Sequence, residues 1–303
     1  VSVGQVQVGD QVLVTDSILI ATGAEQKSLG PIAIDGQQIW GAREAMTPTA
    51  LPARLLIVGA GAIGVEFASF YRALGSAVTL LEVAPNILPA EDTDISALAA
   101  DALSQRGINV QVGQGLDGLA SVDGCVEATI AGETLEFDAA ILSVGVAGRV
   151  QGLGLEALGV TMNQGFVVVD ERQQTSVPGI YAIGDVAGAP CLAHKATHEA
   201  MIAAETIAGH FVQGLQRDRI PGCTYSFPQI ASIGLREQDA GDRALRIGRF
   251  PLYANGKAVV SGHTEGMIKT IFDSKTGALL GAHLIGDSVT ELIQGFTVAI
   301  GLE

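Results

Sequence analysis

The stretch LLIVGAGAIGVEFASFYRALGSAVTLLE, residues 55–82, decides the fold. It consists of an apolar β-type run, the glycine turn GAGAIG, a helical segment that ends at Gly75, and a second β-type run that ends in Glu82. In such a unit the first glycine permits a tight turn, the second lets the backbone approach a pyrophosphate, and the third lets the helix pack closely on the sheet. The free N–H groups and positive dipole end of the helix then face the phosphates. The stretch therefore predicts a doubly wound, dinucleotide-binding α/β domain.

The acid at the end of this unit predicts which dinucleotide binds. Glu82 is placed to accept hydrogen bonds from the adenosine ribose diol and to repel a 2′-phosphate, so we expect NAD rather than NADP. The alternatives are a glycine-tolerant turn without a ligand and, for Glu82, an ordinary solvated acid at a strand end. The residues expected to contact NAD are Gly59, Gly61, Ile63, Gly64, Glu82 and Gly145.

Composition excludes several classes of protein. The 303 residues are 48% hydrophobic, yet no apolar run approaches the roughly 18 residues of a membrane span, and no signal peptide is evident. A net charge of −15 disfavours nucleic acid and anionic membranes as partners. The three cysteines, Cys125, Cys191 and Cys223, are far apart, so we expect buried or half-buried thiols in a reducing cytoplasm, without a disulfide framework. No metal site is expected.

Two further segments indicate a second nucleotide. ILIATG, ending at Gly23, places small residues after a buried strand, where a backbone can pass close to a ligand. TSVPGIYAIGDV places Asp185 between an apolar strand and a helix, where it can bind a sugar-like hydroxyl. Strand-ending turns with a solvated aspartate are the alternative.

Together these motifs resemble the flavoprotein disulfide reductases. Within that group the sequence is similar to the dihydrolipoamide dehydrogenases, most closely to the branch that serves pyruvate dehydrogenase. The segments that carry the similarity are ATG at residues 21–23, GAGAIG at 59–64, TSVPGIYAIGD at 175–185, AIGDVAGAPCLAHKATHEA and IPGCTYSFPQIASIGL. The resemblance implies an NAD-binding domain at 41–139, inserted in a partial FAD-binding domain at 1–40 and 140–215. It also implies an α+β dimerisation domain at 216–303. The FAD-binding residues that it implies are Ala21, Thr22, Gly23, Gly184, Asp185, Ala193 and His194.

The resemblance also implies a reaction. Members of the family oxidise dihydrolipoamide of a lipoyl domain through a redox disulfide, pass the electrons to FAD and reduce NAD⁺, as homodimers bound to 2-oxoacid dehydrogenase complexes. Glu66 corresponds to a glutamate near the nicotinamide and flavin. His194 is a helix-start histidine for which simple packing is the alternative, and Lys195 is equally compatible with a solvated charge.

Several family features have no counterpart in this sequence. The family's first GxGxxG unit, its CxxxxC pair and its terminal His-Pro segment do not appear, and GVAGRVQGL at residues 145–153 leaves the role of Arg149 unassigned. We therefore expect an internal piece of such an enzyme, with no catalytic residue of its own, weak or absent FAD binding and no lipoamide turnover. The alternative is a redox-inactive NAD-binding or assembly protein derived from this family.

Overall fold

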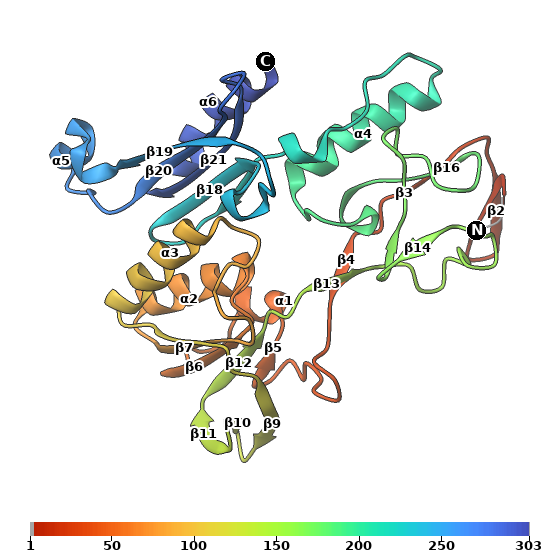
Figure 1. The fold of residues 1–303 in the computed structure, drawn as a ribbon. Helices are drawn as coiled ribbons and strands as arrows, with labels where there is room; N and C mark the ends of the chain where they lie inside the picture. Colours follow the sequence, from red (N-terminus) through yellow and green to blue (C-terminus); the bar gives the residue numbers. More distant parts are fainter. Residues whose placement is uncertain (1–2, 303) are drawn as a thin grey trace. The chain divides into compact units, whose positions relative to one another are not determined.

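The computed structural model describes residues 3–302, which divide into two compact units. The first unit contains residues up to 27 and residues 146–217, and the second contains residues 28–145 and those from 218 onward. Figure 1 shows the elements of both, with the chain coloured from red to blue. Each unit is therefore built from two separate segments of the chain.

A five-stranded parallel sheet forms the centre of the second unit's first half. Its order is β5 (Ile39–Trp40), β12 (Ala139–Leu142), β6 (Arg54–Val58), β7 (Ala77–Glu82) and β8 (Asn109–Val112). Strands β6 and β12 are almost wholly buried, as the continuous apolar runs of parallel strands require. Because β7 and β12 lie on opposite sides of β6, the carboxyl end of β6 is a topological switch point, where ligands bind in such sheets.

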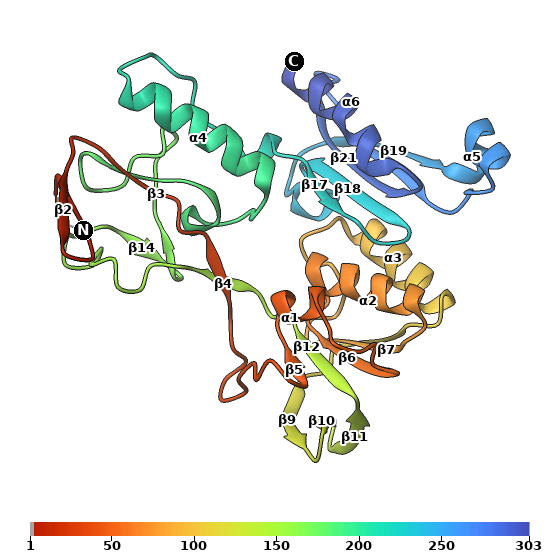
Figure 2. The ribbon, with the colours of Figure 1, turned by 180° about the vertical axis from the view of Figure 1, so that it is seen from behind.

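Two helices pack on this sheet. Helix α2 (Ala62–Leu74) begins after Gly61 and ends at Gly75, whose φ of 108° places it in the left-handed region. Helix α3 (Thr93–Gln105) begins after Asp92, whose side chain accepts a hydrogen bond from the backbone N–H of Asp94. Figure 2 shows both helices between the parallel sheet and the C-terminal sheet, and Ile230 and Ile285 of the C-terminal sheet belong to the same core.

Two antiparallel sheets complete the second unit. One contains β9 (Leu116–Val122), β10 (Cys125–Ile130) and β11 (Glu133–Phe137). The other has the order β17 (Gly222–Thr224), β18 (Gln229–Gly234), β21 (Leu279–Gly286), β20 (Met267–Asp273) and β19 (Leu245–Pro251). Helix α6 (Val289–Leu302) packs on this C-terminal sheet through Ile293 and Ile300, and α5 (Gly256–Ser261) follows β19. The predicted α+β character of this segment is confirmed.

The first unit is made of short strand pairs and one long helix. Strand β3 (Ile18–Ile20) pairs in parallel with β16 (Ile180–Ala182), whereas β1 (Gln5–Val8) and β2 (Gln11–Val14) form a hairpin. Strands β4 (Ala24–Gln26) and β13 (Val146–Gly148) pair antiparallel, as do β14 (Met162–Asn163) and β15 (Phe166–Val167). Helix α4 (Ala193–Ile207) follows the 3-10 turn η1 (Gly184–Ala187).

Several details differ from the sequence-based expectations. Residues 40–46 have a helix-like sequence from Trp40 onward, but helix α1 (Ala42–Met46) begins later, because Trp40 pairs in β5 with β12. Strands β5 and β12 reach beyond the predicted range of 41–139 at its two ends. The expectation of at least half-buried thiols is wrong for Cys191, which is exposed in the turn before α4. Within residues 3–302, no helix is both long and apolar enough to cross a membrane.

Candidate functional site

The glycine turn after β6 has little room for side chains. Gly59 has a φ of 98°, and a Cβ there would lie 2.5 Å from the carbonyl oxygen of Ser143. A Cβ on Gly64 would lie 1.9 Å from the carbonyl oxygen of Gly59, so helix α2 approaches the turn as closely as backbone allows. A Cβ on Gly61, by contrast, would meet no atom of residues 3–302 within 4 Å. The turn is thus closed on its protein side and open at Gly61, at the N-terminus of α2.

Ser143 supports this turn and was missed from the sequence. It directly follows β12, its backbone N–H donates to Val58 O, and its Oγ lies 2.9 Å from Val58 O and 2.6 Å from Gly59 O. The sequence feature that could have indicated this role is its position: Ser143 is a small polar residue at a strand end, two positions before Gly145. Gly145 itself is exposed with a φ of 100°.

Glu82 lies beside the turn, as predicted from its place at the end of β7. Its side chain is only 9% exposed. Oε2 accepts a hydrogen bond of 2.7 Å from the backbone N–H of Ala60, and Oε1 accepts one of 2.9 Å from Ala84. Each carboxylate oxygen has a second lone pair, so the group can brace the turn and still accept further hydrogen bonds. The solvated acid of the alternative interpretation is excluded.

The structure gives different surroundings to Ile63 and Glu66, the two candidates on α2. Ile63 is 42% exposed in the first turn of the helix, beside the open side of the glycine turn. Glu66 is half-buried, and its Oε1 accepts a hydrogen bond of 2.8 Å from the backbone N–H of Tyr225, next to β17. One of the two oxygens of Glu66 therefore attaches α2 to the C-terminal sheet.

In the first unit, the parallel pair β3 and β16 brings the predicted FAD-binding segments to one edge. Residues 21–23 follow β3 and residues 183–185 follow β16, and the backbone N–H of Ile183 donates to Ile20 O at 3.0 Å. Thr22 Oγ1 donates to the carbonyl of Arg149 at 2.7 Å, and the N–H of Arg149 donates to Gly23 O at 2.9 Å. The backbone of Arg149 thus holds the turn of residues 21–23 in place, although Arg149 as a whole is exposed.

Asp185 is held at this edge by a buried ion pair. Lys195 and Glu199, one turn apart on α4, are both fully buried. The Lys195 ammonium donates to Gly188 O at 2.8 Å and to Gly184 O at 3.1 Å, and Glu199 Oε2 accepts from the N–H of Gly184 at 2.7 Å. Lys195 is therefore no solvated charge. The half-buried carboxylate of Asp185 accepts no hydrogen bond from residues 3–302, so it is available to a ligand. Ala193 and His194 are exposed in the first turn of α4.

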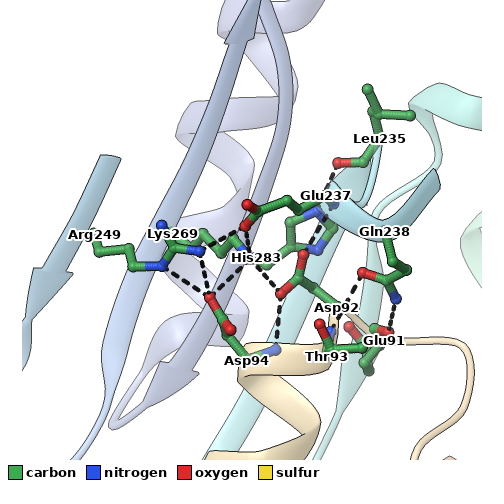
Figure 3. Close-up of polar contacts among 10 residues, drawn as sticks. All are labelled: Glu91, Asp92, Thr93, Asp94, Leu235, Glu237, Gln238, Arg249, Lys269 and His283. Carbon is green, nitrogen blue, oxygen red and sulfur yellow. Dashed lines mark hydrogen bonds and ion pairs between the residues drawn. The ribbon is translucent and has the colours of Figure 1, made fainter. Parts of the chain in front are cut away.

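A cluster of charged side chains lies at the N-terminus of α3, and Figure 3 shows its contacts. The fully buried ammonium of Lys269, on β20, lies 2.7 Å from Asp92 Oδ1, 2.8 Å from Asp94 Oδ2 and 2.6 Å from Glu237 Oε2. Arg249 also pairs with Asp94 and Glu237. These five residues, Asp92, Asp94, Glu237, Arg249 and Lys269, are called the Lys269 cluster below.

The cluster shifts the acid–base properties of its members. Burial alone would raise the pKa of Asp92, but hydrogen bonds from Lys269 and from two backbone N–H groups outweigh it and lower that pKa. The hydrogen bond from Lys269 is the main cause that lowers the pKa of Asp94. Burial opposes the charge of Lys269, yet the three carboxylates raise its pKa. Neighbouring His283 is buried, and this lowers its pKa.

Acid is therefore expected to destabilise the second unit. Because the pKa values of Asp92 and Asp94 are lowered in the folded state, their contribution to stability is complete above the unfolded pKa of about 4 and is lost as the pH falls through the folded values. Buried, neutral His283 adds a loss that begins as the pH falls below about 6.5. Urea unfolding between pH 3 and 8 measures this. In Lys269→Met the part of this loss that comes from Asp92 and Asp94 should disappear, so the decline in stability below about pH 4 should become shallower, while the part from Asp138 and Glu265 stays. An unchanged acid dependence would contradict the assignment.

Comparisons with known proteins identify related sequences for both halves of the chain. Residues 1–200 match the model of the pyridine nucleotide-disulphide oxidoreductases, and residues 220–303 match the dimerisation domain of the same proteins. The dihydrolipoyl dehydrogenase of Zymomonas mobilis is 48% identical over 302 residues, which cover 97% of this chain and 65% of that protein. The dihydrolipoyl dehydrogenase of Rhizobium etli is 49% identical over 304 residues, covering 97% and 63%. The chain thus spans slightly less than two thirds of these relatives.

Solved structures give the same grouping. LpdA from Mycobacterium tuberculosis has a TM-score of 0.90 at 29% identity, over 98% of this chain and 66% of that one. The HOCl-induced flavoprotein disulfide reductase RclA from Escherichia coli, as its Cu(II) complex, has a TM-score of 0.89 at 28% identity, over 98% and 69%. The predicted α/β class and the resemblance to flavoprotein disulfide reductases are confirmed.

Proposed function

Because the chain belongs to the pyridine nucleotide-disulphide oxidoreductase family, we propose that it carries the NAD site of a dihydrolipoyl dehydrogenase. The observation that supports this most directly is the glycine turn of residues 59–64, closed toward the protein, open at Gly61 and braced by Glu82. The pyrophosphate of NAD fits the open side, against the first N–H groups of α2. The proposed contacts are made by Gly59, Gly61, Ile63, Gly64, Glu82 and Gly145. The structural role of Glu82 leaves its remaining lone pairs for the ribose hydroxyls.

The first unit is proposed to contribute to an FAD site. The carboxylate of Asp185 can bind a ribityl chain, and the turn at residues 21–23 can bind an adenosine moiety. Gly184, Ala193 and His194 lie in the neighbouring turn and helix start. When bound, FAD supplies the two-electron chemistry that connects a dithiol to NAD. We assign no catalytic residue in this chain. From the resemblance we propose that Glu66, whose Oε1 accepts a hydrogen bond from the backbone N–H of Tyr225, faces the nicotinamide and the flavin. The NAD-binding, FAD-binding and dimerisation domains stay proposals from the resemblance, with β5 and β12 included in the NAD-binding domain because both belong to its parallel sheet.

The proposed reaction is the oxidation of dihydrolipoamide with reduction of NAD⁺. The named relatives are dihydrolipoyl dehydrogenases, which supports this reaction. A lipoyl domain and a 2-oxoacid dehydrogenase complex are the partners that we propose from the family resemblance. Residues 220–303 supply the family's dimerisation domain, so we propose a homodimer. A cytoplasmic location stays a prediction from the separated cysteines.

Titration with NADH and with NADPH, followed by fluorescence, tests the proposed dinucleotide site. NADH should bind at least about tenfold more tightly, because a hydrogen bond to a charged group contributes about 1.5–3 kcal/mol. In Glu82→Ala this ratio should fall toward one. The ratio is the informative quantity, because loss of the brace to Ala60 weakens both ligands. Glu127→Ala, which removes an exposed acid from β10, controls for net charge. Equal or tighter NADPH binding by the unaltered protein would refute the proposal.

A further inference from the structure

The loop of residues 83–92 connects Glu82 to the N-terminus of α3 and contacts the glycine turn. The backbone N–H of Leu88 donates to Ala60 O at 2.7 Å, while the N–H of Ala60 donates to Glu82. Ala84 donates to the other oxygen of Glu82. Ile87 and Leu88 are almost fully buried in the core of the parallel-sheet domain, and Leu88 has a φ of 48°. The turn, the acid and the loop therefore form one closed set of hydrogen bonds around Ala60.

The same loop is held on its other side by the C-terminal sheet. Arg236 donates to Pro89 O at 3.0 Å, and Gln238 donates to Glu91 O at 2.9 Å. Ser232 donates to the carboxylate of Glu91 at 3.2 Å, and Lys269 binds Asp92, the last residue of the loop. Four successive attachments along residues 89–92 thus come from β18, β20 and the segment after β18.

Lys269 is the strongest of these attachments. It is fully buried, and its ammonium contacts three carboxylates, one of which belongs to Asp92, the N-cap of α3. Breaking a buried ion pair by removing one partner leaves charges without compensation, at a much greater cost than the loss of a surface pair. Without Lys269, Asp92 and Asp94 would repel each other and Glu237, so the end of the loop would move away from the C-terminal sheet.

We propose that Lys269 is a positioning residue of the dinucleotide site: through Asp92 and the 83–92 loop it holds Ala60 and Glu82 in the arrangement that receives NAD. This inference rests on the proposed function of the glycine turn. The dimerisation segment of the chain then contributes to cofactor affinity without touching the cofactor.

Two matched substitutions test the proposal. Lys269→Met removes the attachment at the N-terminus of α3, and Arg106→Met removes the ion pair of Arg106 with Glu265, which joins the same two parts of the second unit at the other end of α3. The dissociation constant of NADH is measured for both at a temperature where each is folded. Lys269→Met should raise it about tenfold, within the range of known couplings between sites, and Arg106→Met should leave it unchanged.

Hydrogen exchange without any cofactor gives an independent measurement. The amide of Leu88 should exchange faster in Lys269→Met than in Arg106→Met, since its acceptor Ala60 O is no longer held in place. If Lys269→Met does not fold, the double variant Arg236→Met/Gln238→Ala replaces it. This variant removes the hydrogen bonds to Pro89 O and Glu91 O without removing a buried charge, because Arg236 is half-buried and Gln238 is exposed. It should raise the dissociation constant of NADH about threefold.

The outcomes separate the two proposals. An unaltered protein that fails to bind NADH refutes the dinucleotide site and with it the positioning role. NADH binding that is equal in the unaltered protein, in Lys269→Met and in the double variant refutes the positioning role alone. Equal weakening by Lys269→Met and Arg106→Met also refutes it, because general loosening of the junction would then explain the result.

Discussion

Replacing Gly64 with alanine is expected to abolish dinucleotide binding and to destabilise the second unit by at least about 3 kcal/mol. The added Cβ would lie 1.9 Å from Gly59 O and 2.8 Å from Ser143 Oγ, and the first obstacle is backbone that cannot rotate away. Helix α2 would have to move off the end of β6, and its N-terminal N–H groups would move with it. Urea unfolding and NADH titration measure the two effects.

Gly61→Ala is the matched control, because it is expected to separate binding from folding. Gly61 has a φ of −71°, and its Cβ would meet no protein atom within 4 Å, so the fold should lose no more than about 1 kcal/mol. The methyl group would, however, occupy the open side where the pyrophosphate approaches, and NADH binding should weaken about tenfold or more. Undiminished NADH binding by Gly61→Ala, or a stable Gly64→Ala protein, would contradict this account of the turn.

The β-α-β unit could be predicted from sequence because local rules determine it. The ends of α2 follow from Gly61 and Gly75, and β7 ends at Glu82 as expected, since glycines and a terminal acid mark these positions directly. The start of α1 could not be predicted in this way, because it depends on pairing with a distant segment. Trp40 joins β5 only through β12, about a hundred residues later in the chain.

Tertiary contacts of charged residues were the least predictable part of the candidate site. Lys195 has the sequence surroundings of an exposed helix-start lysine, and only the carbonyls of Gly184 and Gly188 make its burial possible. Lys269 stands between Ile268 and Thr270 in β20, and its three carboxylate partners come from two other segments of the chain. The hydrogen bond of Glu82 to Ala60 could not be predicted either, since an acid at a strand end indicates a ribose contact but no contact with the glycine turn.

Removing the ammonium of Lys195 is expected to have the largest effect on the first unit. In Lys195→Met, Glu199 stays buried without its ion-pair partner at 3.1 Å, and the carbonyls of Gly184 and Gly188 lose their donor. Breaking a buried pair in this way costs about 3–5 kcal/mol. The turn η1 would loosen, and with it the position of Asp185.

Hydrogen exchange in α4 and η1 measures this loss, because a cost of this size should appear as protection lowered by about two to four orders of magnitude. Arg54→Met is the control, since Arg54 pairs with Glu136 and Asp138 but is 48% exposed, so its loss should leave the protection of α4 and η1 unchanged. The double variant Lys195→Met/Glu199→Leu should recover part of the stability, because it removes the unpaired charge, although the N–H of Gly184 then loses its acceptor. A Lys195→Met protein with unchanged protection in η1 would mean that the ion pair does not hold this turn, and Asp185 would then need another support to face a ligand.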